Sequence, residues 1–426
     1  MSVATEQDRR GWIIVGAIFL TMFFIWGAIN SGVVFFVPII KYFGWSRTKL
    51  SVAFSIGWVT GGAAGPLIGW IADRVNPKKM MMVGATVTGL AYLVLSRATN
   101  FGEILAINGL FGICVGASTV IPCSIVIASW FTARRGLAMG IAFAGISLGG
   151  AVMTILANYA IASGGWRFGY VAIALPILVV VVPSIVIFIR TRTAAEIHES
   201  DQALDTVVEK SDEPVVPIEL PGLEISQARR TRSFWMISLA QLLGGAAIIG
   251  MGPHFIAYLT GVGYTASFAA TVVSLYLVAT TVGTLLGGPF ADRWGARSAM
   301  IATYILAALG MVGLFTASHT LGLAISVIAG GFATGAVSVQ MPMMMIESLG
   351  LKRFGSVYGI TSVFFTAGAA VSPVVTGRVF DQTGSYTAVI ATFAVMFMAC
   401  ALAISGCRTL EREKVQFALQ PREVAA

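Results

Sequence analysis

Few side chains in this sequence could carry chemistry. The 426-residue chain holds three histidines, His198, His254 and His319, which lie far apart in the sequence. No serine, histidine and aspartate are grouped as nucleophilic catalysis requires, and no cysteine or histidine spacing fits a metal site. The sequence therefore predicts neither an enzyme nor a bound metal or cofactor. His254 is a candidate for proton exchange, because histidine gains and loses a proton near neutral pH; a structural hydrogen bond to a neighbouring helix is the alternative.

Uncharged polar and aromatic side chains within long apolar segments form the second group of candidates. Such side chains can orient a small solute inside an apolar cavity. They can equally join neighbouring helices by hydrogen bonds, which is the alternative for each of them. The candidate substrate-binding residues are Asn30, Ser118, Thr119, Ser147, Tyr276, Thr280, Thr334 and Phe364.

Membrane-spanning helices must position these candidates. The chain is 57% hydrophobic and only 11% charged, with a mean hydropathy of +0.86, whereas a soluble domain carries about 25% charged residues. Its apolar segments repeatedly reach the ~18–20 residues that cross a bilayer core of ~30 Å. The predicted spans are 12–37, 48–72, 80–97, 104–129, 136–162, 168–190, 233–258, 265–291, 299–317, 321–346, 354–378 and 386–407.

The distribution of basic residues predicts the orientation of these spans. Twelve crossings place both termini on one side, and all but six of the 27 Lys and Arg residues fall on that side. An excess of Lys and Arg marks the cytoplasm. We therefore expect a multi-pass integral protein of a bacterial-type plasma (inner) membrane with cytoplasmic termini. The net charge of +8 reflects this topology and an attraction to anionic membrane lipid, and it does not indicate a nucleic-acid partner.

The chain repeats itself at half its length. The stretch from Gly69 to Arg74 reads G-x-x-A-D-R, and the same pattern returns 219 positions later, from Gly288 to Arg293. Glycines further along the chain repeat at the same separation. Two homologous halves, each placing the same charged turn at the membrane surface, explain this agreement. The predicted units are an N-terminal six-helix bundle (1–190), a polar cytoplasmic linker (191–232), and a C-terminal six-helix bundle with its tail (233–426).

The repeated turn resembles the signature of the major facilitator superfamily, over nearly the whole chain. Three further segments, 43–47, 130–140 and 253–263, resemble its monocarboxylate and oxalate:formate antiporter branch. The resemblance implies an all-α membrane fold of twelve helices in two pseudo-symmetric bundles, a site between them, and function as a monomer. Because helix 8 lines the cavity in this family, Tyr276 and Thr280 are the first candidates for substrate contact. The resemblance also implies that the repeated turns act in gating, through Gly69, Asp73, Arg74, Gly288, Asp292 and Arg293.

The sequence departs from that branch in its charges. The family's helix 8 arginine, which grips a carboxylate, is missing, because residues 265–291 contain no Arg or Lys. The acidic residue expected just before helix 1 is also missing. All Asp and Glu residues map to loops, the linker, the tails or helix ends, so that no carboxylate is left within the membrane for a proton relay.

These features together lead to one main hypothesis for function and two alternatives. The main hypothesis is a secondary active transporter of a small organic acid of the monocarboxylate kind, working by alternating access, with H+ coupling through His254 as a further hypothesis. The first alternative is an exporter of a neutral or amphipathic small molecule, which the uncharged helices favour. The second is a membrane sensor that keeps the fold without moving a substrate.

Overall fold

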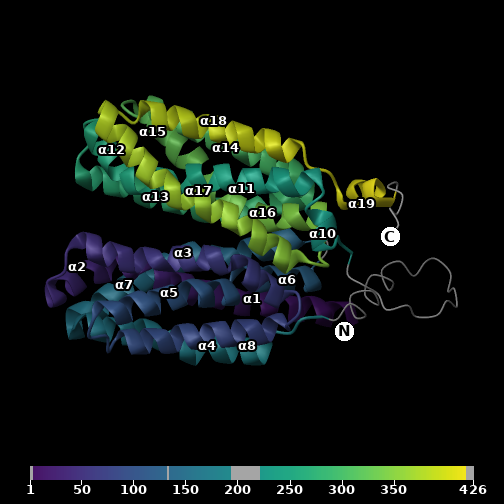
Figure 1. The fold of residues 1–426 in the computed structure, drawn as a ribbon, viewed down its shortest axis with the longest axis horizontal. Coiled ribbons are helices and arrows are strands. Elements are labelled where there is room, and N and C mark those ends of the chain that lie inside the picture. Colours follow the sequence, from purple (N-terminus) through teal and green to yellow (C-terminus); the bar gives the residue numbers. More distant parts are fainter. Residues whose placement is uncertain (1–2, 132–133, 193–220, 419–426) are drawn as a thin grey trace, which may run out of the picture.

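Helices form almost the whole described structure. A computed structural model describes residues 3–131, 134–192 and 221–418 of the chain. Within these residues the helices form two bundles that lie side by side (Figure 1). The predicted linker, 191–232, falls mostly outside the described residues. Its last part, from residue 221 onward, is described and leads into the second bundle.

The first bundle contains the helices of the N-terminal half. Its helices are α1 (Val3–Asn30), α2 (Gly32–Phe43), α3 (Arg47–Ala72), α4 (Pro77–Leu95), α5 (Phe101–Ser118), α6 (Val120–Trp130), α7 (Arg135–Pro176) and α8 (Val182–Phe188). A π-helical turn, Ile177–Val181, joins α7 to α8.

The second bundle repeats this plan. Its helices are α10 (Ile225–Ala228), α11 (Arg232–Gly250), α12 (Phe255–Gly261), α13 (Ala266–Trp294), α14 (Ala296–Phe315), α15 (Thr320–Ile325), α16 (Gly331–Leu349), α17 (Phe354–Thr383), α18 (Thr387–Ser405) and α19 (Leu410–Ala418). A 3-10 turn, Gly252–His254, precedes α12, and a π-helical turn, Ser326–Gly330, joins α15 to α16.

Twelve membrane crossings account for these helices. The described residues contain 11 continuous helical stretches that are long and apolar enough to cross a membrane, and one of them, Arg135–Phe188, has 54 residues. At 1.5 Å per residue that stretch is about 80 Å long, more than twice the hydrocarbon core. It breaks at Gly165, whose φ of 78° is not helical, and so it crosses twice. The predicted fold of twelve spans in two bundles is confirmed.

The two bundles use equivalent helix pairs. In the first, α1 packs against α7 and α3 against α5; in the second, α11 packs against α17 and α13 against α16. Small residues allow these contacts. A Cβ on Gly149 of α7, for instance, would lie 1.9 Å from the backbone oxygen of Phe23 on α1, so that only glycine permits this approach.

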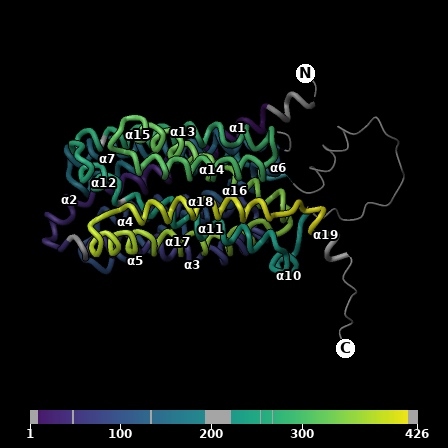
Figure 2. The backbone as a smooth tube through the Cα atoms, turned by 90° about the horizontal axis from the view of Figure 1, so that it is seen from above, coloured from purple at the N-terminus to yellow at the C-terminus, as the bar shows by residue number. Residues whose placement is uncertain are grey.

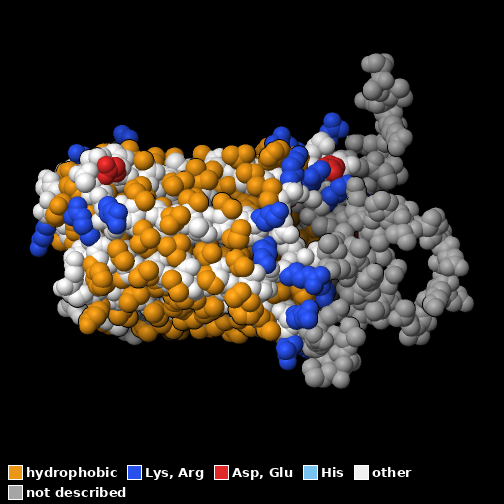
Figure 3. All heavy atoms as spheres, turned by 90° about the horizontal axis from the view of Figure 1, so that it is seen from below, with side chains coloured by type: hydrophobic (Ala, Val, Ile, Leu, Met, Phe, Trp, Pro, Cys, Tyr) orange, Lys and Arg blue, Asp and Glu red, His pale blue; other side chains and the backbone are white. Residues whose placement is uncertain are grey.

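The start of α1 and helix α19, the first and last described helices, lie at the same end of the molecule (Figure 2). The turns α3–α4, α6–α7, α13–α14 and α16–α17 are also at this end, and we call it the basic end. Lys and Arg side chains gather there and, more sparsely, at the far end, with a broad apolar belt between them (Figure 3). Such a belt matches the bilayer core, with charged groups kept to its two surfaces.

Gly149→Ala is expected to destabilise the first bundle, because the new methyl group would force α1 and α7 apart. Overpacking of this kind costs about 1–3 kcal/mol, and thermal unfolding in detergent should begin several degrees lower. Gly16→Ala on α1 is the matched control, since no atom lies within 4 Å of its added Cβ. Equal unfolding temperatures for the two variants would contradict the described contact.

Candidate functional site

Two aspartates join the halves at the basic end, and Asp292 supplies the first contact. Its carboxylate oxygens accept hydrogen bonds from the backbone N–H groups of Gly136 (2.7 Å) and Leu137 (2.9 Å). These donors belong to the first turn of α7, where no helical carbonyl can accept them. A carboxylate at a helix N-terminus is also favoured by the helix dipole. Asp292 of the second half therefore caps a helix of the first half.

Asp73 makes the equivalent contact in the opposite direction. Its carboxylate accepts from the backbone N–H groups of Gly355 (2.8 Å) and Ser356 (2.9 Å) at the start of α17. Burial raises the pKa of the Asp73 carboxyl above its ordinary value, while the hydrogen bonds from Ser356 and Gly355 and the charge of Arg353 oppose this shift. We call the two aspartates with the four N–H donors they bind the latch.

Glycines bring the halves close enough for the latch to form. A Cβ added to Gly69 would lie 2.0 Å from the oxygen of Gly355, and one added to Gly288 would lie 1.8 Å from the oxygen of Gly136. Gly69 and Gly288 each lie one helical turn before a latch aspartate. Gly355 and Gly136 lie in the helix turns that these aspartates cap. Four of the six predicted gating residues thus meet across the two halves: Gly69, Asp73, Gly288 and Asp292.

The two predicted gating arginines do not bridge the halves. Arg74 stays on its own turn, where its guanidinium donates to the backbone oxygen of Trp70 (3.3 Å) and lies over the Trp70 ring, 4.1 Å from its centroid. Arg293 is exposed at the same level in the second half. Both side chains are placed to meet the membrane surface.

The described end of the linker contacts the latch region. Glu224 pairs with Lys352 (3.2 Å) and Arg353 (2.9 Å) in the α16–α17 turn, and these cations hold the pKa of its carboxyl below the ordinary value. The backbone N–H of Leu223 donates to the oxygen of Leu349 (3.0 Å). Arg353 directly precedes α17, and its charge also acts on Asp73, so that the linker end and the latch share one turn.

The close contacts between the halves lie toward the basic end. On α3 they run from Gly62, which meets Thr366 of α17, to Gly69. Between α7 and α13 they involve Gly136 and Gly140. All these positions fall in the half of each helix that is nearer the latch, so the glycine contacts between the halves lie on the latch side of the membrane's middle.

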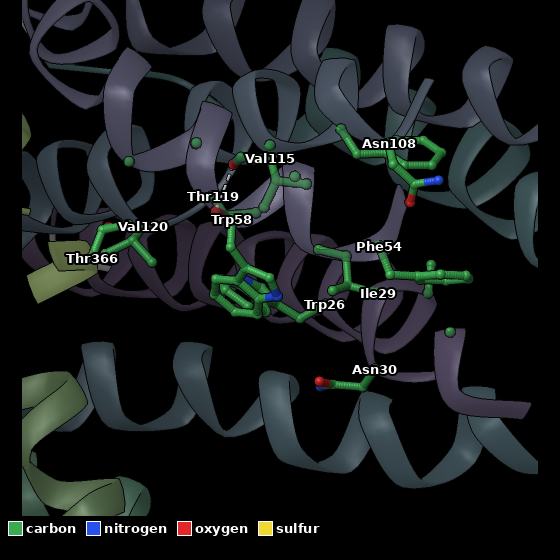
Figure 4. A pocket seen from close by; sticks show the side chains of 18 of the residues that line it. Trp26, Ile29, Asn30, Phe54, Trp58, Asn108, Val115, Thr119, Val120 and Thr366 are labelled. Atoms are coloured by element: carbon green, nitrogen blue, oxygen red, sulfur yellow. Dashed lines mark hydrogen bonds between the residues drawn. The ribbon is translucent and has the colours of Figure 1, made fainter. Parts of the chain in front are cut away.

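A cavity begins beside this contact, because Gly62 and Gly65 of α3 also line it. It has a volume of about 510 Å³ and is lined by α1–α6, α7 and α17. Its wall on α3 extends from Ile68 to Phe54, a length of ~20 Å at 1.5 Å per residue. Of the described residues that line it, none is Asp, Glu, Lys, Arg or His. Polar contact comes from uncharged side chains, among them Asn30, Asn108 and Thr119 (Figure 4).

A broken helix brings Thr119 to the cavity wall. Its backbone (φ −117°, ψ −113°) separates α5 from α6, and Pro122 follows within one turn. Proline has no N–H and clashes with the carbonyl of the preceding turn, which accounts for a break here. The Thr119 hydroxyl donates to the oxygen of Val115 (2.7 Å). Discontinuous helices near the midplane mark binding sites in many transporters.

The predicted substrate-binding residues fall into two groups. Asn30 and Thr119 line the cavity, whereas the other six lie outside its wall. Tyr276 on α13 shares a hydrogen bond of 2.7 Å with Thr334 on α16, and Thr280 donates to the oxygen of Tyr276 (2.9 Å). In this conformation Tyr276, Thr280 and Thr334 form hydrogen bonds within or between helices. Their contact with a substrate stays a prediction.

The remaining predicted residues are also placed by helix packing. Ser118 is buried and donates to the oxygen of Cys114 (2.7 Å). Phe364 packs edge-on against Trp235, 6.3 Å between ring centroids. Ser147 is half-buried on α7. Substrate contact by these residues likewise stays a prediction.

His254 lies between three helices of the second bundle. Its Nε2 is 3.0 Å from the backbone oxygen of Pro373 on α17, which can only accept a hydrogen bond, so Nε2 carries a proton. Its Nδ1 is 3.3 Å from the hydroxyl of Tyr386, beside α18. The side chain is half-buried and bonded on both sides.

Trp26, Trp58 and Asn108 line the cavity but are absent from the predicted set. The two tryptophans read as ordinary apolar residues of a membrane span, and Asn108 follows an apolar run. The one signal in the sequence is the position of the two tryptophans near the middle of spans 1 and 2, away from the membrane surfaces where tryptophan is usually enriched. Asn108 lies near the start of span 4, and nothing in the sequence sets it apart.

This arrangement defines a class of protein: a membrane protein of two homologous halves that meet at one end, with a cavity lined mainly by the first half and by α17. A sequence profile of the Major Facilitator Superfamily matches residues 14–272 and 255–423. The chain therefore belongs to the Major Facilitator Superfamily, and it is a multi-pass membrane transporter rather than an enzyme.

Known relatives agree with this membership. Monocarboxylate transporter 13 of Bos taurus is 23% identical over 384 residues, which cover 89% of this chain and 84% of the bovine protein. The fujikurins efflux protein of Gibberella fujikuroi is 25% identical over 361 residues, 82% of this chain and 71% of that protein. Among solved structures, FucP in the outward conformation superimposes with a TM-score of 0.67 at 15% identity, covering 91% of this chain and 97% of FucP.

Neutralising the latch should favour conformations in which the cavity is closed at the far end. Charge-assisted hydrogen bonds contribute about 1–3 kcal/mol each, so Asp73→Asn and Asp292→Asn together should shift the equilibrium tenfold or more. A cysteine at exposed Asn30 reports this, because the native cysteines Cys114, Cys123, Cys400 and Cys407 are buried. Labelling by a membrane-impermeant maleimide from the far side should slow.

Asp381→Asn is the matched control, because Asp381 is an exposed carboxylate near the far end of α17. Its labelling rate should equal that of the parent protein. Unchanged labelling in the double latch variant, with folding intact, would show that the aspartates do not hold this conformation.

Proposed function

We propose that this protein is a secondary active transporter of a small organic acid that works by alternating access. The latch is the observation that carries the proposal. Two equivalent aspartates, one from each half, cap helices of the other half at the basic end, and a cavity runs from beside this contact along α3 toward the far end. Such paired, reversible contacts suit a protein whose halves rock about a central site.

We further propose that the basic end faces the cytoplasm and that the described conformation opens away from it. The excess of Lys and Arg at the basic end supports this orientation. We also propose that the protein lies in the plasma membrane of a bacterial-type cell, that anionic lipid contacts the basic end, and that the protein functions as a monomer. In this orientation the latch forms the inner gate.

The organic-acid substrate is supported by the similarity to monocarboxylate transporter 13. The uncharged cavity adds a condition. A carboxylate that enters it loses hydration without gaining a salt bridge, which is unfavourable. We therefore propose that the acid is carried protonated, or is held by uncharged donors only.

Proton coupling through His254 is a separate part of the proposal. A proton added at Nδ1 requires the Tyr386 hydroxyl to turn and accept, so protonation would change the contact between α12 and α18.

Export of a neutral or amphipathic molecule is the second candidate. The absence of charged side chains among the described residues of the cavity wall favours it, as does the similarity to a fungal efflux protein. Resistance of cells that express the protein to amphipathic toxins, without uptake of any acid, would favour this candidate.

Reconstituted protein should take up a labelled organic acid saturably, and an inward proton gradient should stimulate the uptake. His254→Gln keeps a donor and an acceptor, so it should fold and still exchange substrate but lose the stimulation. His319→Gln, at an exposed helix start far along the chain, should behave as the parent. Folded protein that moves no acid in either direction would refute the organic-acid proposal, and equal stimulation of both variants would refute the role of His254.

A further inference from the structure

Two tryptophans from different helices face each other in the cavity. Trp26 on α1 and Trp58 on α3 both line it, with their ring centroids 6.2 Å apart and their planes at 45° (Figure 4). Trp58 has an exposed fraction of 58%. A large aromatic surface left uncovered inside a cavity gains free energy when a ligand covers it.

The position of Trp58 sets it apart from the other exposed tryptophans. Trp70 and Trp294 lie at the basic end of α3 and α13, where Arg74 covers one ring and Phe290 stacks on the other. Tryptophan at such levels belongs to the aromatic belt of a membrane protein. Trp58 lies near the middle of α3, too far from the membrane surfaces to belong to the aromatic belt. Its exposure is explained by the cavity that it lines.

The surroundings of the tryptophan pair are apolar, with unused hydrogen-bond donors. Phe54 and Phe365 also line the cavity. The indole N–H of Trp26 and the hydroxyl of Tyr170, both of cavity-lining residues, are buried without a hydrogen-bond partner among the described residues. Unsatisfied buried donors are rare and costly. Neither atom is accessible from the cavity in this conformation, so an acceptor oxygen of a ligand reaches such a donor only when the neighbouring side chains move.

The size of the cavity is a further restriction on the ligand. Its volume of about 510 Å³ falls within the ~300–1,000 Å³ of pockets that hold drug-sized ligands. An acid of two or three carbons would leave most of that space to water. A ring-bearing acid would fill more of it and could cover the indole faces.

We infer that Trp26 and Trp58 form an aromatic subsite that makes the transporter prefer aromatic carboxylic acids over short aliphatic ones. The ring of the acid lies against the exposed face of Trp58, and its oxygens accept from the uncharged donors of the wall. This inference names the substrate class of the site already proposed and rests on that proposed function.

The test compares benzoate with acetate and lactate in proteoliposomes. Labelled benzoate should exchange, and unlabelled benzoate should compete for it at least tenfold better than either short acid. Trp58→Leu should weaken benzoate competition about tenfold and leave that of acetate nearly unchanged, while Trp58→Phe should lie between. Trp235→Leu is the matched control, because Trp235 is 52% exposed but lies outside the cavity wall.

Three outcomes would count against these ideas in different ways. If short acids exchange and benzoate competes no better than they do, the aromatic subsite is refuted and the proposed function stands. Equal weakening of benzoate and acetate in Trp58→Leu also refutes the subsite, because it shows a structural role for the side chain. If folded protein exchanges none of the acids, the proposed function fails, and the inference fails with it.

Discussion

The structure depends on carboxylates placed at helix N-termini across the boundary between its halves. A helix start leaves backbone N–H groups without acceptors, and a buried start must find them elsewhere. Asp73 and Asp292 supply the acceptors from the opposite half. Each aspartate gains hydrogen bonds only while the halves touch at the basic end. The same four contacts thus hold the halves together at the basic end.

Glycine makes these contacts possible, and the chain uses it differently along one helix. Gly57 and Gly61 on α3 meet α5 in their own bundle, whereas Gly65 and Gly69 meet α17 in the other. The first pair serves permanent packing, and the second lies on the surface that must separate during rocking.

The two repeated turns also differ. Asn76 caps its own helix at a φ of −53°. Gly295 instead takes a φ of 79°, and the carboxylate of Glu347 accepts the hydrogen bond of the following N–H.

The sequence predicted the architecture well because length, hydropathy and repetition report it directly. The resemblance of the repeated turns to the family also singled out Asp73 and Asp292, and their role in gating stays a prediction. Their partners could not be predicted from residue type, because the donors are backbone N–H groups. The cavity wall was predicted only in part: Tyr276 and Thr334 satisfy each other, and no local pattern distinguishes this pair from residues that face a cavity. Trp26 and Trp58 look like ordinary apolar residues until two helices bring them together.

The most direct test of this account is the distance between the far ends of the two halves. Spin labels at Lys41→Cys on α2 and Thr260→Cys on α12, both exposed, report it by pulsed electron resonance in lipid nanodiscs. Protein with the latch intact should show mainly the longer distance, and Asp73→Asn with Asp292→Asn should add a shorter population. One unchanged distance distribution in both proteins would contradict the claim that the aspartates control which end is open.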